Sequence, residues 1–116
     1  MRIARRTVVA VFALAVLGSC SGGDGGSAAT VTIHTFSFQP DPITVQAGTK
    51  ITFHNDDKIL HTVTSGTRDA PTPDRFDSKL DGAGSSFTVT LDTPGTYPYF
   101  CKIHPGEGMT GKIVVR

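Results

Sequence analysis

Between two β-type segments near the C-terminus, residues 96–100 and 112–115, the chain reads Cys101-Lys102-Ile103-His104-Pro105-Gly106-Glu107-Gly108-Met109. A thiol, an imidazole and a thioether fall within these nine residues, and all three are soft or borderline metal ligands. A loop that joins neighbouring antiparallel strands curls back on itself, and its proline and two glycines permit the bends. The three side chains can therefore face a single point.

The best candidate for a fourth metal ligand is His61. It follows the loop at residues 55–60 and begins a short β-type segment at residues 61–64. Two histidines, one cysteine and a weakly bound axial methionine form the ligand set of a blue-copper electron-transfer site. Four protein ligands leave no open position for a substrate, so we expect one copper ion cycling between Cu(I) and Cu(II), and no enzymatic activity.

The rest of the sequence predicts short strands separated by turns. The alternation of apolar and polar residues changes parity near residues 34–36, which indicates a β-bulge, and residues 65–84 show no regular pattern. With 13 Gly, 7 Pro and no long helical period, the chain is expected to be all-β. We predict an antiparallel Greek-key sandwich or barrel of seven to eight strands. The recognisable strand segments are residues 31–38, 43–45, 51–53, 61–64, 87–91, 96–100 and 112–115.

The N-terminus has the features of an export signal. Three arginines precede an apolar run at residues 8–17, and ten helical residues rise only about 15 Å, half of the hydrocarbon core of a bilayer. The run closes with Leu17-Gly18-Ser19-Cys20, which resembles the lipobox of bacterial lipoproteins. The resemblance implies cleavage before Cys20 and a diacylglycerol on its thiol, which would anchor the protein to a membrane.

This interpretation divides the chain into three parts. Residues 1–19 are the predicted signal peptide, residues 20–29 the lipidated Cys20 with a flexible linker, and residues 30–116 a single domain. Removing the three N-terminal arginines changes the formal charge from +1 to −2, so the exported part is mildly acidic. We expect it to face the periplasm or the cell exterior.

Length and charge exclude several classes of protein. A chain of 116 residues suits one domain and excludes most multi-domain enzymes. A near-neutral charge argues against nucleic acid as a partner. The two cysteines suggest a disulfide, but Cys20 is assigned to lipid and Cys101 to copper. We therefore expect a monomeric domain without a covalent cross-link.

A longer stretch around the loop resembles a known family. Residues 97–112 read Tyr97-Pro98-Tyr99-Phe100-Cys101-Lys102-Ile103-His104-Pro105-Gly106-Glu107-Gly108-Met109-Thr110-Gly111-Lys112. Their C-x-x-H-x-x-x-x-M spacing is similar to that of plastocyanin and pseudoazurin, in the cupredoxins. Upstream, Phe53-His54-Asn55-Asp56 and His61-Thr62-Val63 also look like this family, and the resemblance covers residues 30–116. It implies the cupredoxin fold.

The resemblance also implies a role for each candidate ligand. His61 and His104 would bind copper through an imidazole nitrogen, Cys101 as a thiolate, and Met109 as the long axial ligand. In the family, one ring edge of the second loop histidine is exposed through an apolar patch, where electrons pass to redox partners. The corresponding docking surface here is His104 with Pro105, Ile59 and Leu60 nearby.

Two positions depart from the family pattern. Thr62 stands where plastocyanins usually have an asparagine that braces the ligand loop, so we expect a looser brace here. Phe100 stands where the family has an exposed tyrosine before the ligand cysteine, and no long acidic run is present. The identity of the redox partner therefore does not transfer from the family.

Other functional interpretations of the sequence compete with that of an electron carrier. A non-redox copper-delivery or storage protein would use the same ligands, although a closed thiolate site releases metal slowly. A metal-free β-sandwich surface module would stay colourless after copper addition. Cys101 alone is compatible with a buried structural thiol, or with a nucleophile that has His104 as its base, but the ligand spacing favours copper. His34 and His54 are interpreted as ordinary strand or surface histidines.

Overall fold

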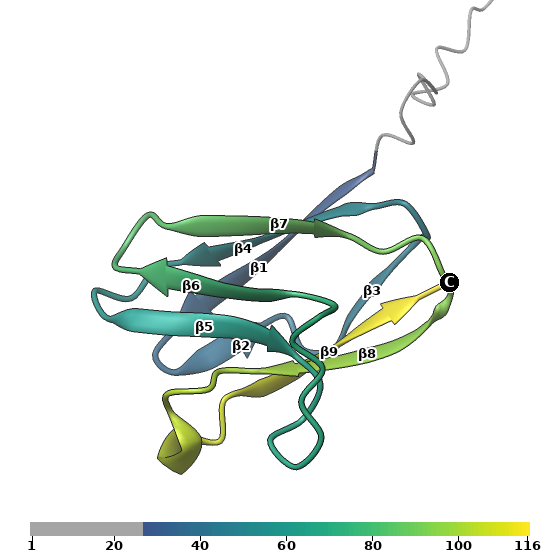
Figure 1. Ribbon diagram of the computed structural model, residues 1–116. Helices are drawn as coiled ribbons and strands as arrows, with labels where there is room; N and C mark the ends of the chain where they lie inside the picture. Colours follow the sequence, from purple (N-terminus) through teal and green to yellow (C-terminus); the bar gives the residue numbers. More distant parts are fainter. Residues whose placement is uncertain (1–26) are drawn as a thin grey trace, which may run out of the picture.

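The computed structural model describes residues 27–116 (Figure 1). The predicted signal peptide, the predicted lipid attachment at Cys20 and most of the predicted linker lie outside the described residues. Strand β1 begins at Ala28, so regular structure starts two residues before the expected domain boundary at residue 30. Across residues 27–116, the structure contains no helix with the length and apolar character needed to cross a membrane.

The described chain consists of strands and one short 3-10 turn. Every segment that the apolar pattern predicted to be extended contains a strand. The elements are β1 (Ala28–His34), β2 (Ser37–Gln39), β3 (Ile43–Val45), β4 (Lys50–Asn55), β5 (Leu60–Ser65), β6 (Asp77–Asp81), β7 (Ser86–Thr90), β8 (Gly95–Phe100), η2 (Pro105–Glu107) and β9 (Thr110–Val115).

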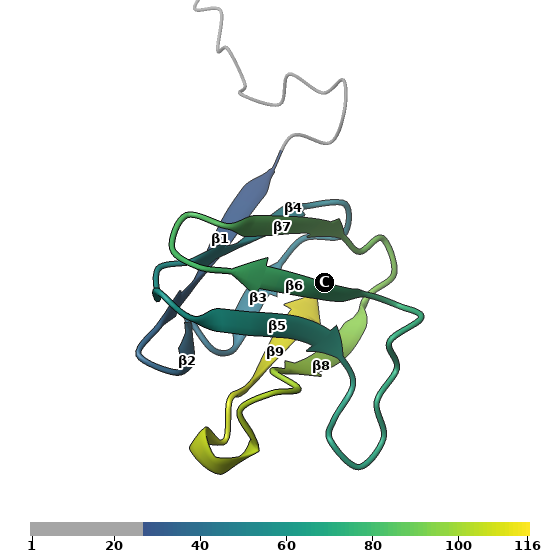
Figure 2. The ribbon, with the colours of Figure 1, turned by 60° about the vertical axis from the view of Figure 1, so that its left-hand side comes forward.

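The strands form two sheets that pack face to face, which confirms the predicted β-sandwich (Figures 1 and 2). One sheet has the order β2-β1-β4-β7 and the other the order β3-β9-β8-β5-β6. Most strand pairs are antiparallel, as expected, but β1 pairs with β4 and β3 with β9 in parallel, so both sheets are mixed. Side-chain alternation is the same in both pairings, so the sequence pattern carries no information about strand direction.

The inward faces of the two sheets form one core. In β4, Ile51 and Phe53 are fully buried, and their polar neighbours are partly exposed, as expected for a strand with one face on the core. Phe38, Phe53 and Tyr99 meet edge to face, with the Tyr99 ring centroid 4.7 Å from that of Phe38 and 5.1 Å from that of Phe53. This aromatic cluster joins the sheets.

The predicted β-bulge near residues 34–36 is wrong. The parity changes because the chain turns tightly there: β1 and β2 pair antiparallel, with His34 opposite Ser37. The two turn residues, Thr35 and Phe36, have φ values of 50° and 58°. Positive φ at both central residues is the requirement of a type I′ hairpin turn, which normally selects Gly, Asn or Asp.

The stretch over residues 65–84, in which no regular structure was expected, contains β6. This strand pairs with β5 at the edge of the five-stranded sheet, and Leu80 is its single buried residue. Because β6 buries a single apolar side chain, its sequence shows almost no alternation of apolar and polar residues.

Candidate metal centre

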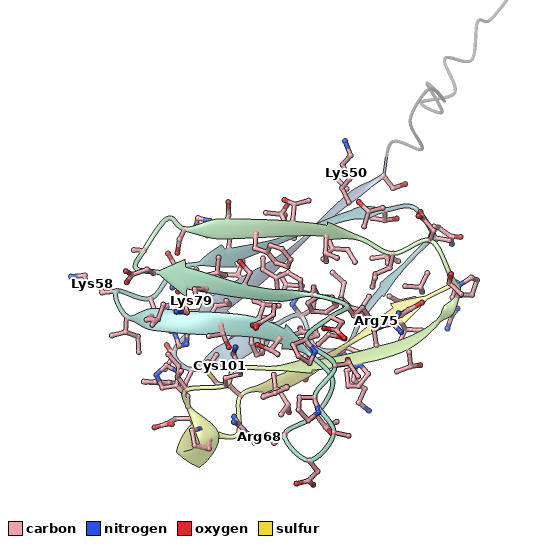
Figure 3. All side chains as sticks on the ribbon, viewed as in Figure 1. Lys50, Lys58, Arg68, Arg75, Lys79 and Cys101 are labelled. Carbon is pink, nitrogen blue, oxygen red and sulfur yellow. The ribbon has the colours of Figure 1, made fainter. Side chains whose placement is uncertain are left out.

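The structure brings three predicted ligands together at one end of the sandwich. His61 is the second residue of β5, Cys101 directly follows β8, and His104 lies in the β8–β9 loop. One ligand atom of each lies within 4.8 Å of the ligand atoms of the other two. Figure 3 shows Cys101 inside the molecule, at the end from which this loop projects.

The fourth predicted ligand, Met109, lies at the base of the same loop. The backbone N–H of Cys101 donates to the carbonyl of Met109 at 3.0 Å, so the two residues face each other across the loop. After η2, Gly108 adopts a left-handed conformation (φ 60°) that turns the chain back toward β9. Met109 is 1% exposed and belongs to the core, although it follows an open loop.

The separations among the donor atoms fit one shared metal ion. The two Nδ1 atoms of His61 and His104 lie 3.2 Å apart. The Sγ of Cys101 lies 3.3 Å from Nδ1 of His104 and 4.0 Å from Nδ1 of His61. Metal–nitrogen and metal–sulfur bonds of about 2.0 and 2.3 Å place two ligands of one ion at most roughly 4.3 Å apart. All three separations lie within that limit.

Asp57 fixes the ring of His61. Its Oδ2 lies 2.8 Å from Nε2 of His61, a residue with no exposed surface. Burial alone would raise the pKa of Asp57, but hydrogen bonds from Thr35, His61 and Phe36 outweigh this effect and lower the pKa below its usual value. The carboxylate is therefore ionised at neutral pH and accepts the Nε2 hydrogen. Nδ1 of His61 is left to face the other donors.

A buried asparagine organises the loop that carries Asp57. Asn55 has no exposed surface and donates from Nδ2 to the carbonyls of Ile59, at 2.9 Å, and Leu80, at 3.0 Å. Its Oδ1 accepts from the backbone N–H of Asp57 at 2.9 Å. These bonds close the turn between β4 and β5 and set the position from which Asp57 reaches His61.

Thr62 braces the cysteine side of the site. Its backbone N–H donates to Sγ of Cys101 at 3.3 Å, and its hydroxyl accepts from the N–H of Lys102 at 2.8 Å. The hydroxyl oxygen thus reaches the loop backbone, and a looser brace than that of an asparagine stays a prediction. Thr64 and Asp77 continue the network: the two threonine hydroxyls lie 3.2 Å apart, and Thr64 donates to Asp77 at 2.8 Å.

Asp77 closes this network through a charge pair. Its Oδ2 accepts from Nζ of Lys102 at 2.8 Å, with the two side chains 30% and 42% exposed. Burial raises the pKa of Asp77, but the hydrogen bonds from Lys102 and Thr64 outweigh it and hold the pKa below its usual value. The first residue after the ligand cysteine is thus tied to both β5 and β6.

Arg68 and Phe36 lie against the outer side of the site. Arg68 donates to the carbonyl of His104 at 3.1 Å, and its guanidinium lies 5.4 Å from the ring centroid of Phe100. Phe100 is 4% exposed, so the aromatic residue before the ligand cysteine is covered here. The ring of Phe36 meets His61 and His104 edge to face, at centroid distances of 5.7 and 5.1 Å.

Sequence reasoning identified Thr62 next to the ligands but missed Asp57, Arg68 and Phe36. The run Asn55-Asp56-Asp57, a few residues before the ligand strand β5, is a usable signal, because such residues bond to the nearby backbone. Nothing local marks Arg68 or Phe36. His34 lies at the exposed end of β1, 3.2 Å from Asp56, and His54 lies in β4. Among the described residues, neither histidine joins the metal-type cluster.

Comparison with known proteins agrees with this geometry. The model of the copper binding proteins of the plastocyanin/azurin family matches residues 26–116. A chloroplastic plastocyanin from Tetradesmus obliquus is 31% identical over 126 residues, which cover 99% of this chain and 81% of that protein. A plastocyanin from Sambucus nigra is 36% identical over 101 residues, covering 81% of this chain and 94% of that protein.

A solved structure supports the fold independently. The purple cupredoxin from Nitrosopumilus maritimus superimposes with a TM-score of 0.67 at 24% identity, covering 76% of this chain and 99% of that one. The chain thus belongs to the plastocyanin/azurin family of copper-binding proteins. Its cluster of two histidines and a cysteine, with Met109 at the loop base, fits one type 1 copper ion.

Proposed function

We propose that this protein is a one-electron carrier whose copper is bound by His61, Cys101, His104 and Met109. The observation that carries the proposal is the convergence of three donor atoms, from β5 and from the β8–β9 loop, within 4.8 Å. Bound copper would supply the Cu(I)/Cu(II) couple. The chain supplies the donors, their fixed positions and their separation from water.

The donors are held in place by hydrogen bonds to the protein. Asp57 bonds the ring of His61, Thr62 bonds the sulfur of Cys101, and Arg68 bonds the backbone of His104. A site whose donors are fixed by other groups presents nearly the same positions to both oxidation states. This preorganisation favours electron transfer over delivery, which requires donors that move to release the metal.

The surroundings of the site do not favour a substrate. Two cavities in the described part of the chain, of about 300 and 210 Å³, lie along β8, and neither is lined by a candidate ligand. With four protein ligands, the site has no open position for a reacting molecule. We therefore infer a carrier rather than an enzyme.

We propose that redox partners dock near His104. Two large apolar residues of the described chain are exposed in this region: Ile103, directly before His104, is 43% exposed, and Ile59, two residues before His61, is 41% exposed. A contiguous exposed apolar patch is typical of interaction sites, and we propose that Ile59 and Ile103 belong to such a patch next to the two ligand histidines. Pro105 and Leu60 adjoin the same two positions in the sequence.

We propose that the protein is exported and anchored to a membrane. The basic start, the short apolar run and the lipobox-like sequence before Cys20 support export, followed by attachment of the chain to a membrane through lipid on Cys20. We also propose that this anchor keeps the carrier at the extracytoplasmic face of the membrane, close to its redox partners.

Voltammetry of the copper-loaded protein tests the proposed function. An electron carrier gives a reversible one-electron wave, and repeated cycles of reduction by ascorbate and reoxidation leave the copper bound. A delivery protein loses copper to a Cu(I) chelator on reduction, which would contradict the proposal. In the His104→Gly variant, we expect slower electron exchange with an electrode or a redox protein.

A further inference from the structure

Asp57 makes contacts with two separate parts of the metal centre. Its carboxylate accepts from Nε2 of His61 at 2.8 Å and from the backbone N–H groups of Thr35, at 2.9 Å, and Phe36, at 3.4 Å. Its side chain is 15% exposed, and that of His61 is fully buried. One carboxylate thus joins β5 to the turn between β1 and β2, which lies more than twenty residues away in the sequence.

The turn requires this support. Thr35 and Phe36 both adopt positive φ, a conformation that is unfavourable for residues with a Cβ atom. An anionic acceptor for both N–H groups stabilises the turn, since hydrogen bonds to a charged group are stronger than neutral ones. The turn also holds the Phe36 ring in edge-to-face contact with the rings of His61 and His104.

We propose that Asp57 is a positioning residue of the copper centre, which fixes the ring of His61 and lowers the reduction potential of the bound copper through its charge. The proposal rests on the proposed function, because it concerns the same site. No other carboxylate among the described residues bonds to a candidate ligand: Asp56 pairs with His34 and Asp77 with Lys102.

The direction of the effect follows from electrostatics. A carboxylate that accepts the Nε2 hydrogen makes Nδ1 of His61 a better electron donor. A fixed negative charge next to a largely buried ligand also favours the more positive oxidation state, and this interaction is weakly screened where water is excluded. Both effects stabilise Cu(II) relative to Cu(I).

Asp57→Asn removes the negative charge and keeps one of the two acceptor oxygens. The amide oxygen can still accept from Nε2 of His61, but the amide NH2 then faces the N–H of Thr35, so this bond to the turn is lost together with the charge. We expect the ratio of Cu(II) to Cu(I) affinity to fall about tenfold, which for one electron corresponds to a potential about 59 mV higher. The matched control is Asp56→Asn, which removes the same charge at the next residue, from a side chain that is 55% exposed and bonds to no ligand. Its potential should shift much less.

The potentials of the two variants decide the charge effect. A larger rise for Asp57→Asn than for Asp56→Asn supports the proposal. Equal shifts, or a fall in potential for Asp57→Asn, would overturn it. Wild-type protein that binds no copper would instead refute the proposed function, and the positioning role is then tested on the metal-free protein.

Nitrogen NMR of the histidine rings of wild-type metal-free protein provides that second test, and it does not depend on whether a variant folds. We expect His61 to carry its hydrogen on Nε2, with slow exchange against solvent, because Asp57 holds it in a buried position. A hydrogen on Nδ1, or an Nε2 hydrogen that exchanges as fast as that of exposed His34, would contradict the positioning role.

Discussion

Substitution of Thr62 by valine removes one oxygen from the brace behind Cys101 and preserves the shape of the side chain. The lost hydroxyl accepts from the backbone N–H of Lys102 at 2.8 Å, and Thr62 is 1% exposed, so no bulk water replaces it. Leaving a buried donor unsatisfied costs about 1–3 kcal/mol. The bond is part-buried because Lys102 is an exposed residue, so we expect about 1 kcal/mol, or a roughly fivefold smaller ratio of folded to unfolded protein.

The same change should weaken the metal site. The sulfur of Cys101 keeps its bond from the Thr62 N–H, but the residue after it is no longer tied to β5. Residues that orient metal ligands typically contribute 10- to 100-fold to metal affinity. We expect a loss near the lower end, about tenfold, because one of the two bonds at Thr62 remains.

Two assays on three proteins test this reasoning. Urea unfolding of metal-free protein, followed by circular dichroism, gives the stability difference, and competition with a chelator gives the copper affinity. Thr62→Ser is the matched control, since it keeps the hydroxyl and removes a buried methyl group, at a cost of about 1 kcal/mol. Serine should therefore lose stability and keep copper affinity, whereas valine should lose both. Wild-type copper affinity in Thr62→Val would refute the role of the brace.

Three further predictions concern other parts of the chain. Gly111→Ala places a Cβ against the ring of Tyr99, which is 1% exposed and cannot move aside. Thermal unfolding should therefore show a loss of stability of about 1–3 kcal/mol. The control Gly106→Ala places its Cβ in open space and should lose almost no stability. Asp77→Asn should cost about 0.5–1 kcal/mol at neutral pH in urea unfolding. Because the folded pKa of Asp77 is lowered, this difference should disappear as pH falls through and below 3.8, and a constant difference would contradict the charge pair. Cys20→Ser should abolish incorporation of labelled fatty acid and release the protein from membranes, and unchanged membrane association would exclude the lipid anchor.

Local patterns in the sequence were sufficient to predict most of the strands and to select the three candidate ligands that the structure brings together, His61, Cys101 and His104. In β4, the buried residues Ile51 and Phe53 alternate with more exposed polar residues. The two-residue repeat of a half-buried strand is therefore visible directly in the sequence. Cys101, His104 and Met109 all lie in one short loop between adjacent strands, so the strand order alone makes them neighbours. His61 was a candidate because it lies close to the start of a strand, as the second residue of β5, after a loop rich in polar residues.

The features that were missed depend on partners distant in the sequence. The turn at Thr35 and Phe36 contains none of the residues typical of a type I′ turn, and Asp57 stabilises it from another segment. The edge strand β6 buries one side chain, and the parallel pairing of β1 with β4 has no local signature. In the same way, the contact between Arg68 and His104 exists only after folding.

Titration of the purified protein with Cu(II), followed by visible absorption, tests the central claim most directly. One equivalent should produce an intense blue colour that ascorbate bleaches and oxygen or another oxidant restores, and Cys101→Ala should abolish the colour, because the thiolate is one of the donors. A protein that stays colourless, binds more than one tightly held copper ion, or keeps its colour without Cys101 would contradict a single site built from His61, Cys101, His104 and Met109.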